Sequence, residues 1–364
     1  TDTLAAAPRV AALLARLAGV YFWYFAGVGV LLPYWSLYLA ERGLGPEMIG
    51  LLLGLIQAAK LVAPMLAGGI ADRHNATMAV VRGGTAVAAL AFLVLAAGEP
   101  ALPWLVAGML VFSLGLNAAL PLFEATTLAH LGRDQSRYGP IRLWGSVGFV
   151  LAAYGVGRWV EAAGVAVVPW ALAALTVALA ASGWLVPRAR VAAGQAPGLG
   201  GRLHEPRVLA LLATGLLMQA SHGVYYAFYS IYLSDLGHSG RTIGLLWGLA
   251  VLAEVVLFAL MPRLRGLAGI RALLIWTFGL TALRWALLGS GVTALPGLIL
   301  IQCLHAFSFG SHHALSMALI SRFFPDRLAA RGQALYRVSA DGEFLGGAVL
   351  AVLAGLVCWR WLHP

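Results

Sequence analysis

The chain has 364 residues, of which 61% are hydrophobic and only 10% charged, and its formal net charge is +10. A water-soluble domain carries about 25% charged residues, so this composition excludes a soluble protein and predicts an all-α polytopic membrane protein. The net positive charge does not indicate nucleic-acid binding, because the arginines stand singly between apolar runs and form no basic face.

The apolar runs predict eleven membrane-spanning helices, in chain order. They cover residues 17–40, 47–71, 77–97, 102–130, 139–160, 164–186, 207–234, 241–262, 268–289, 294–323 and 332–358. Most of the arginines fall on one side of the membrane if the N-terminus is placed in the cytoplasm. The positive-inside rule therefore predicts a cytoplasmic N-terminus.

The longest polar stretch, Pro187 to Pro206, is rich in Gly, Ala and Arg and separates the sixth span from the seventh. This composition is typical of a flexible linker. We therefore expect an N-terminal six-helix bundle over 1–187, a cytoplasmic linker over 188–206 and a C-terminal helix bundle over 207–364, with five spans visible.

One segment occurs twice at a constant offset: Tyr38 to Lys60 aligns with Tyr232 to Glu254, and ten residues are identical between the copies. Both copies start outside the membrane and run toward the cytoplasm. The two halves of the chain are therefore expected to be parallel repeats about an axis along the membrane normal. A duplicated membrane fold with charges near its midplane is typical of a secondary transporter.

Lys60, the only lysine of the chain, aligns with Glu254, and both lie within apolar runs. A charge at mid-bilayer costs about 2.5–3.5 kcal/mol on insertion scales, so it is normally paired or exposed to water. A structural ion pair and a substrate or proton site are both open. Glu254 without a partner would have a raised pKa and could carry a proton.

Other ionisable residues also lie within the predicted spans. Glu124 lies deep in the fourth span and Arg142 opens the fifth, where it either pairs with Glu124 or extends to the interface. Asp341 and Glu343 lie in the eleventh span, and because they are two positions apart they point to different sides of the helix. One of them is the obvious partner for Lys60.

Histidines and tyrosines supply the remaining polar groups. His222, His305, His312 and His313 lie in predicted spans, but they do not have metal-ligand spacing, and a hydrogen-bonded role is favoured over a metal site.

Mid-depth tyrosines suit an apolar cavity with a few polar groups; we expect Tyr24, Tyr225 and Tyr229 to line it. The sequence shows no nucleophile–base or metal constellation, so it does not predict an enzyme.

Two motifs carry a family resemblance. The run Gly68 to Arg73, between the second and third spans, resembles the cytoplasmic loop signature of the major facilitator superfamily, which implies a gating role for Asp72 and Arg73. The run Tyr138 to Phe149 resembles the start of the fifth helix in the lactose permease and phenylpropionate permease branch of that superfamily.

The resemblance implies roles for four residues. Glu124 and Arg142 match the acidic and basic residues that clamp substrate in the sugar permease, His305 matches its tenth-helix histidine, and Glu254 matches a carboxylate that joins substrate binding to proton coupling. Gln302 and Ser308 stand where the sugar permease has a basic and an acidic residue, which argues against a sugar. The superfamily has twelve spans, whereas eleven are predicted here. Either one predicted span combines two, or the twelfth is absent, and we expect it to be absent.

Together these observations predict a proton symporter for a small organic solute, best an aromatic or other organic anion. We expect Lys60, Arg142 and His305 to orient the substrate and Glu254 to carry the proton, with Asp341 or Glu343 second. The superfamily arrangement brings Lys60 toward Asp341 or Glu343, and Glu254 toward the helix of Arg142.

The expected protein is a monomer in a bacterial-type inner membrane, and its partners are substrate, protons and lipid, without nucleic acid, metal or cofactor. A proton-coupled exporter of small hydrophobic compounds, a sugar or nucleoside symporter, and a non-transporting receptor or scaffold remain alternatives.

Overall fold

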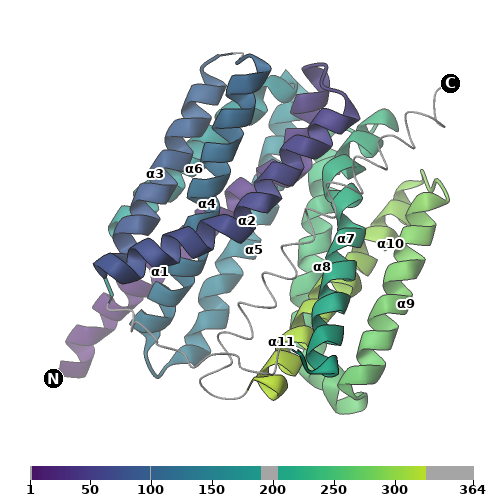
Figure 1. Ribbon diagram of the computed structural model, residues 1–364. Helices are drawn as coiled ribbons and strands as arrows, with labels where there is room; N and C mark the ends of the chain where they lie inside the picture. The colour runs from purple at the N-terminus through teal and green to yellow at the C-terminus, as the bar shows by residue number, and fades with distance from the viewer. Residues whose placement is uncertain (1, 99, 190–203, 325–364) are drawn as a thin grey trace. The chain divides into compact units, whose positions relative to one another are not determined.

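The computed structural model describes residues 2–98, 100–189 and 204–324, with side chains from Val10 onward. Helices joined by short turns make up this part of the chain (Figure 1). The first half contains α1 (Asp2–Glu41), α2 (Pro46–His74), α3 (Thr77–Ala96), α4 (Leu102–Leu131), α5 (Tyr138–Ala163) and α6 (Val168–Leu185). The second half contains α7 (Pro206–Asp235), α8 (Gly240–Leu267), α9 (Ile270–Gly289), α10 (Leu295–His305) and α11 (His312–Phe323).

The all-α membrane fold predicted from the sequence is confirmed. Eight helices in the described part of the chain are long and apolar enough to cross a membrane: α1 to α4 and α6 to α9. The predicted fifth span is α5, whose apolar content is lowered by Arg142, Arg158 and Glu161. The predicted span 294–323 is continuous helix, in which a π-helical segment, Ala306–Ser311, joins α10 to α11. The predicted span 332–358 lies outside the described residues.

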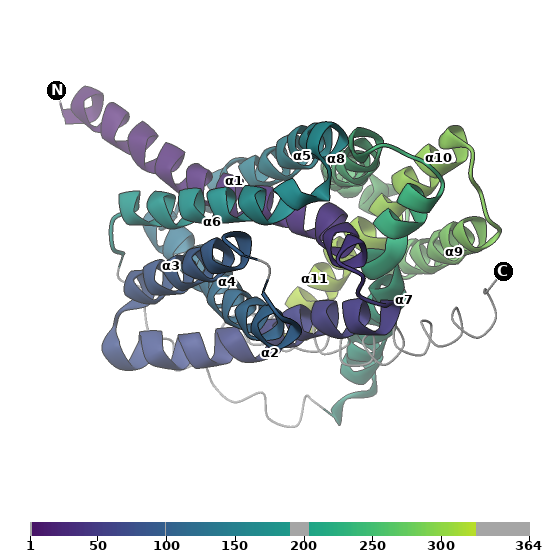
Figure 2. The ribbon, with the colours of Figure 1, turned by 90° about the horizontal axis from the view of Figure 1, so that it is seen from above.

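The chain divides into two compact units, one formed by α1 to α6 and the other by α7 to α11. In the first unit α1 packs against α5 and α6, and α3 packs against α4 and α6, as Figures 1 and 2 show. Small residues allow the close approaches: a Cβ added to Gly84 of α3 would lie 2.8 Å from the carbonyl oxygen of Gly115 in α4. Close contacts of this kind hold membrane helices together where the hydrophobic effect contributes little.

In the second unit α9 packs against α10 and the π-helical segment, and α11 packs against α7 and α9. A buried apolar cluster joins α8, α9 and α11 and consists of Leu257, Met261, Ile270, Ala306 and Leu315. Helices α7 to α10 and the π-helical segment contribute the polar side chains described below.

The repeated segment forms the same turn in both copies. Gly43 and Gly237, which align in the repeat, have φ angles of 78° and 80°. The next residue donates a backbone hydrogen bond back across the turn in each copy, from Leu44 to Leu39 at 3.2 Å and from His238 to Leu233 at 3.0 Å. A glycine in the left-handed region followed by this bond is a common way to end a helix.

Because the left-handed conformation disfavours a Cβ, Gly237→Ala is expected to lower the free energy of unfolding by about 1–2 kcal/mol. The control is Gly279→Ala in α9, where an added Cβ meets nothing within 4 Å and the change should be neutral or slightly stabilising. Thermal unfolding of the purified variants in detergent measures the difference. Equal melting temperatures for the two variants would contradict this account of the turn.

The expected position of Asp72 and Arg73 in a loop is wrong, because both lie in the last turn of α2, which continues to His74. Asn75 adopts the left-handed conformation at φ 46° and caps the helix, so the chain leaves helical geometry only there. Both side chains are exposed. The sequence motif therefore marks the end of a helix, and the connection to α3 consists of Asn75 and Ala76.

Candidate functional site

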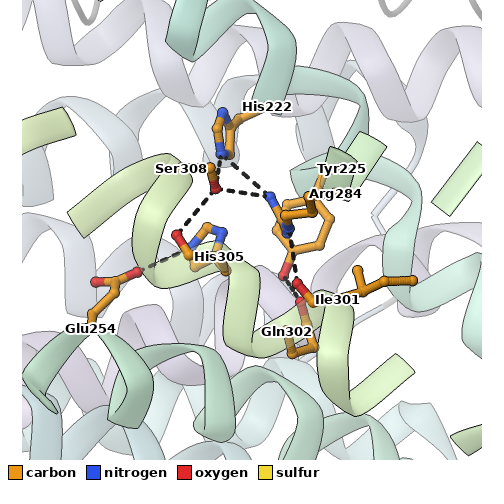
Figure 3. A network of polar contacts seen from close by, with 8 residues as sticks. All are labelled: His222, Tyr225, Glu254, Arg284, Ile301, Gln302, His305 and Ser308. Carbon is orange, nitrogen blue, oxygen red and sulfur yellow. Dashed lines mark hydrogen bonds and ion pairs between the residues drawn. The ribbon is translucent and has the colours of Figure 1, made fainter. Parts of the chain in front are cut away.

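The second unit buries a connected set of polar side chains, called here the polar network (Figure 3). Its members are His222 and Tyr225 of α7, Glu254 of α8, Arg284 of α9, Gln302 and His305 of α10, and Ser308 of the π-helical segment. All of them except Glu254 are buried. Spacings of three residues bring His222 and Tyr225, and likewise Gln302 and His305, to one face of their helices. The network therefore combines a titratable pair and a buried cation, which are described in turn.

Glu254 and His305 form the first part of the network. The Nε2 atom of His305 lies 3.0 Å from the Oε1 atom of Glu254, and the two side chains are 5% and 14% exposed. The imidazole ring is stacked on Phe309, with ring centroids 5.8 Å apart, and lies beside Tyr225 at 5.5 Å. A carboxylate and an imidazole in hydrogen-bond contact can share or exchange one proton, so this pair is suited to proton transfer.

Arg284 is the centre of the second part and is 0% exposed. Its Nε donates to the carbonyl oxygen of Ile301 at 3.1 Å, and its Nη1 donates to Ser308 Oγ at 3.3 Å and to His222 Nε2 at 3.4 Å. Its Nη2 has no hydrogen-bond partner within the described residues. The guanidinium carbon lies 4.3 Å from the ring centroids of both Tyr225 and Trp285, a cation–π arrangement.

The hydrogen bonds of His222 fix which of its nitrogens carries the proton. Its Nδ1 lies 2.7 Å from the carbonyl oxygen of Met218, which can only accept, so Nδ1 donates. Nε2 is then the acceptor for Ser308 Oγ at 3.1 Å and for Arg284. In this arrangement His222 is neutral, so it neither adds to the positive charge of the guanidinium nor compensates it.

Gln302 and the tyrosines of α7 complete the network. Tyr225 donates its hydroxyl to Gln302 Oε1 at 3.1 Å, and its ring packs against Tyr229 and Trp247 with centroids 4.8 and 5.1 Å apart. Gln302 Nε2 and the hydroxyl of Tyr229 have no hydrogen-bond partner among the residues that the structure covers. Buried polar atoms are rarely left unsatisfied, so these atoms indicate a place where a ligand or water binds.

In the first unit, the predicted residues Glu124 and Arg142 are connected through tyrosines. Tyr138 donates its hydroxyl to Glu124 Oε1 at 3.4 Å, and its ring lies edge-on to Tyr21 at 6.3 Å. The guanidinium of Arg142 lies 3.9 Å from the ring centroid of Phe25 and 5.5 Å from that of Tyr21. A direct pair between Glu124 and Arg142 stays a prediction.

The other predicted residues are distributed over both units. Tyr24 is buried in α1, and Lys60 is half-buried in α2. Asp341 and Glu343, the partners expected for Lys60, lie outside the described residues. The contact found for Glu254 is His305 of its own unit, and its expected approach to the helix of Arg142 also stays a prediction.

Arg284 is not among the site residues predicted from the sequence. The signal was present, because an arginine inside a predicted membrane span, as Arg284 is in the run 268–289, is by default a functional candidate. Gln302 and Ser308 stood out only as departures from the sugar permease, and His222 as one of several histidines. No group of three or more potential metal ligands occurs within the described residues.

Known proteins resemble this chain along almost its whole length. The sequence profile of the MFS_1 like family matches residues 14–363. A probable 3-phenylpropionic acid transporter of Escherichia coli (strain K12) is 33% identical over 349 residues, which cover 94% of this chain and 90% of that protein. The maltose permease of Geobacillus stearothermophilus is 27% identical and covers 94% of this chain and 86% of the permease.

A solved structure supports the same fold. A crystal structure of a mutant of the nucleoside transporter NupG has a TM-score of 0.82 at 18% sequence identity, with 96% of this chain and 92% of that chain covered. An identity this low supports the fold alone. Since the family profile covers nearly the whole sequence, the chain belongs to the MFS_1 like family of the major facilitator superfamily and is a multi-pass membrane transporter, not an enzyme.

Proposed function

We propose that the chain is a proton symporter that moves a small aromatic carboxylate across the membrane by alternating access. The observation that carries this proposal is the Glu254–His305 pair, which lies in the same polar network as Arg284 and its aromatic neighbours. A titratable pair beside a cation and aromatic rings suits an anion that travels with a proton. The similarity to a probable 3-phenylpropionic acid transporter supports the same substrate class.

Proton coupling follows from the charge of Glu254. The ionised carboxylate accepts a hydrogen bond from His305 Nε2, which fixes the imidazole. Protonation of Glu254 removes that negative charge, weakens its hold on His305 and leaves the local charge more positive. The site then binds an anion more strongly, so proton and substrate favour each other's binding, as linkage requires.

The other predicted residues keep the roles expected from the sequence. Lys60 and Arg142 attract and orient the anion, Glu124 positions Arg142, and Tyr24, Tyr225 and Tyr229 provide aromatic contacts. Asp341 or Glu343 is the second candidate for carrying the proton, and Asp72 and Arg73 serve the gate at the end of α2. The halves 1–187 and 207–364, connected by the linker 188–206, alternate as one monomer in a bacterial inner membrane with a cytoplasmic N-terminus.

The test is uptake of radiolabelled 3-phenylpropionate into liposomes that contain the purified chain. A gradient of one pH unit, alkaline inside, supplies about 1.4 kcal/mol per proton, so electroneutral one-for-one symport should accumulate the anion about tenfold. Protein-free liposomes measure the diffusion of the protonated acid, which is subtracted from the initial rate. An initial rate that does not respond to the gradient would contradict proton coupling.

Neutral substrates are the second possibility, because relatives and structural neighbours include a maltose permease and a nucleoside transporter. Competition with maltose and uridine in the same assay separates these cases. Inhibition by either of them but not by benzoate or other aromatic acids would replace the anion with a neutral solute. Active extrusion of an uncharged compound such as 3-phenylpropan-1-ol would instead favour an exporter.

A further inference from the structure

We propose that Arg284 binds the carboxylate of the substrate, and that the neutral side chain of Ser308 keeps the guanidinium available for it. This inference rests on the proposed transport of an aromatic carboxylate and names the residue that selects the anion. It makes α9, which contributes no predicted site residue, the helix that determines substrate charge.

The charge balance around Arg284 is the first step of the argument. Its contacts are a carbonyl oxygen, a hydroxyl, a neutral imidazole and two aromatic rings, none of which is anionic. No carboxylate forms an ion pair with it within residues 2–98, 100–189 and 204–324. Because an uncompensated buried charge is costly, the guanidinium has a strong tendency to attract an anion.

The unsatisfied atoms indicate the chemistry of that anion. Arg284 Nη2 and Gln302 Nε2 are both buried donors without acceptors in the described structure. They are close neighbours in the network, since Tyr225 donates to the Gln302 amide while its ring lies against the guanidinium. A carboxylate has only acceptor atoms and takes parallel hydrogen bonds from a guanidinium, so it satisfies donors that an alcohol satisfies less well.

The surroundings of this donor set favour an aromatic or other apolar body on the ligand. Tyr225 contacts Tyr226, Tyr229, Trp247 and Trp285, with ring centroids between 4.8 and 5.8 Å apart. Such rings accept edge-to-face or offset stacking from a further ring. The combined arrangement therefore fits a monocarboxylate with one aromatic ring better than a sugar, which would need many polar partners.

Ser308 determines whether Arg284 needs an external anion. Its Oγ lies 3.3 Å from Arg284 Nη1, and the residue is 0% exposed. A carboxylate at this position would reach ion-pair distance and neutralise the guanidinium from within the protein. With serine there, the positive charge stays uncompensated until substrate binds, so position 308 sets the charge of the preferred substrate.

The first experiment compares Ser308→Asp with Ser308→Asn, which have nearly the same size and differ in charge. Equilibrium binding of 3-phenylpropionate to the purified full chain in detergent is measured by calorimetry. Kd for Ser308→Asp should exceed Kd for the size-matched neutral variant Ser308→Asn by at least about tenfold. A Kd for Ser308→Asp within about threefold of that for Ser308→Asn would overturn the proposal.

The second experiment tests Arg284 through a ratio of affinities. The unaltered chain should prefer 3-phenylpropionate over its neutral amide, 3-phenylpropanamide, by at least about tenfold, and Arg284→Gln should reduce that preference to nearly one. Arg271→Gln, at the exposed start of the same helix, is the matched control and should keep the preference. Retention of the full preference in Arg284→Gln would overturn the assignment.

The outcomes separate this inference from the proposed function, because binding is measured without a pH gradient. A chain that prefers the carboxylate through Arg284 but does not accumulate it on a gradient contradicts proton coupling alone. Failure to bind 3-phenylpropionate at all would overturn both proposals. If the variants do not fold, a structure of the unaltered chain with 3-(4-iodophenyl)propionate decides, since a carboxylate beyond hydrogen-bond reach of Arg284 refutes the site.

Discussion

Glu254→Gln is expected to abolish the accumulation of 3-phenylpropionate on a pH gradient, which should fall to the level of protein-free liposomes. The amide preserves the size of the side chain, and its oxygen can still accept the hydrogen bond from His305 Nε2, 3.0 Å away in the unaltered chain. It cannot take up or release a proton, however. Because positioned proton-transfer groups typically contribute about 10²–10⁴-fold to a rate, the gradient-driven initial rate should decrease by at least about 10²-fold.

Exchange of labelled for unlabelled substrate shows whether the variant is still a transporter. Glu254→Gln should retain this exchange, since exchange needs no net movement of protons. The control is Glu47→Gln in the first turn of α2, where the side chain is exposed, and both activities should be unaffected. Gradient-driven accumulation by Glu254→Gln at the rate of the unaltered chain would remove Glu254 from the coupling step and leave Asp341 or Glu343 as the carrier.

Gly148→Ala is expected to cause the largest loss of stability among single-methyl substitutions in the first unit. A Cβ at Gly148 of α5 would lie 2.9 Å from the carbonyl carbon of Phe22 in α1 and closer still to its carbonyl oxygen. The colliding atoms belong to the backbone, so the two helices must move apart instead of a side chain rotating away. Overpacking of this kind costs typically about 1–3 kcal/mol of unfolding free energy.

The matched control lies on the same helix. At Gly155 of α5 an added Cβ meets nothing within 4 Å, and replacing a helical glycine with alanine stabilises by about 0.5–1 kcal/mol. The melting temperature in detergent should therefore fall for Gly148→Ala and stay constant or rise for Gly155→Ala. If the two variants melt together, the helices α1 and α5 are not in the close contact described here.

The helices were predictable because each depends on one local property, a run of apolar residues long enough to cross a membrane. Helix ends were less predictable, as α2 shows. A charged pair such as Asp72 and Arg73 suggests a loop. At an exposed helix end, however, charged side chains stay in contact with solvent, so they do not lower the stability of the helix. The end of α2 is instead determined by Asn75, whose left-handed conformation is a single-residue preference that hydropathy does not register.

The candidate site was predictable in some of its members and not in its contacts. Glu254 and His305 stand out as polar residues in apolar runs, but their pairing joins α8 to α10 and depends on how these helices pack. Arg284 shows the opposite case. It was visible in the sequence as a membrane arginine, and its importance emerges only when its neighbours prove to be neutral. The absence of a carboxylate beside Arg284 among the described residues is a property of its three-dimensional surroundings, which spacing along the chain does not report.

The π-helical segment Ala306–Ser311 gives one continuous helix two registers. His305 and His312 are seven positions apart and would share a face in a regular α-helix. Here His305 faces Glu254 of α8 and Tyr225 of α7, whereas His312 lies beside Phe278 of α9, with ring centroids 5.8 Å apart. The wider i to i+5 turns of the π-helix account for this offset. The segment thus behaves as an inserted residue whose removal would rotate α11 relative to α10 and turn His312 toward the helix face that His305 occupies, about two turns further along.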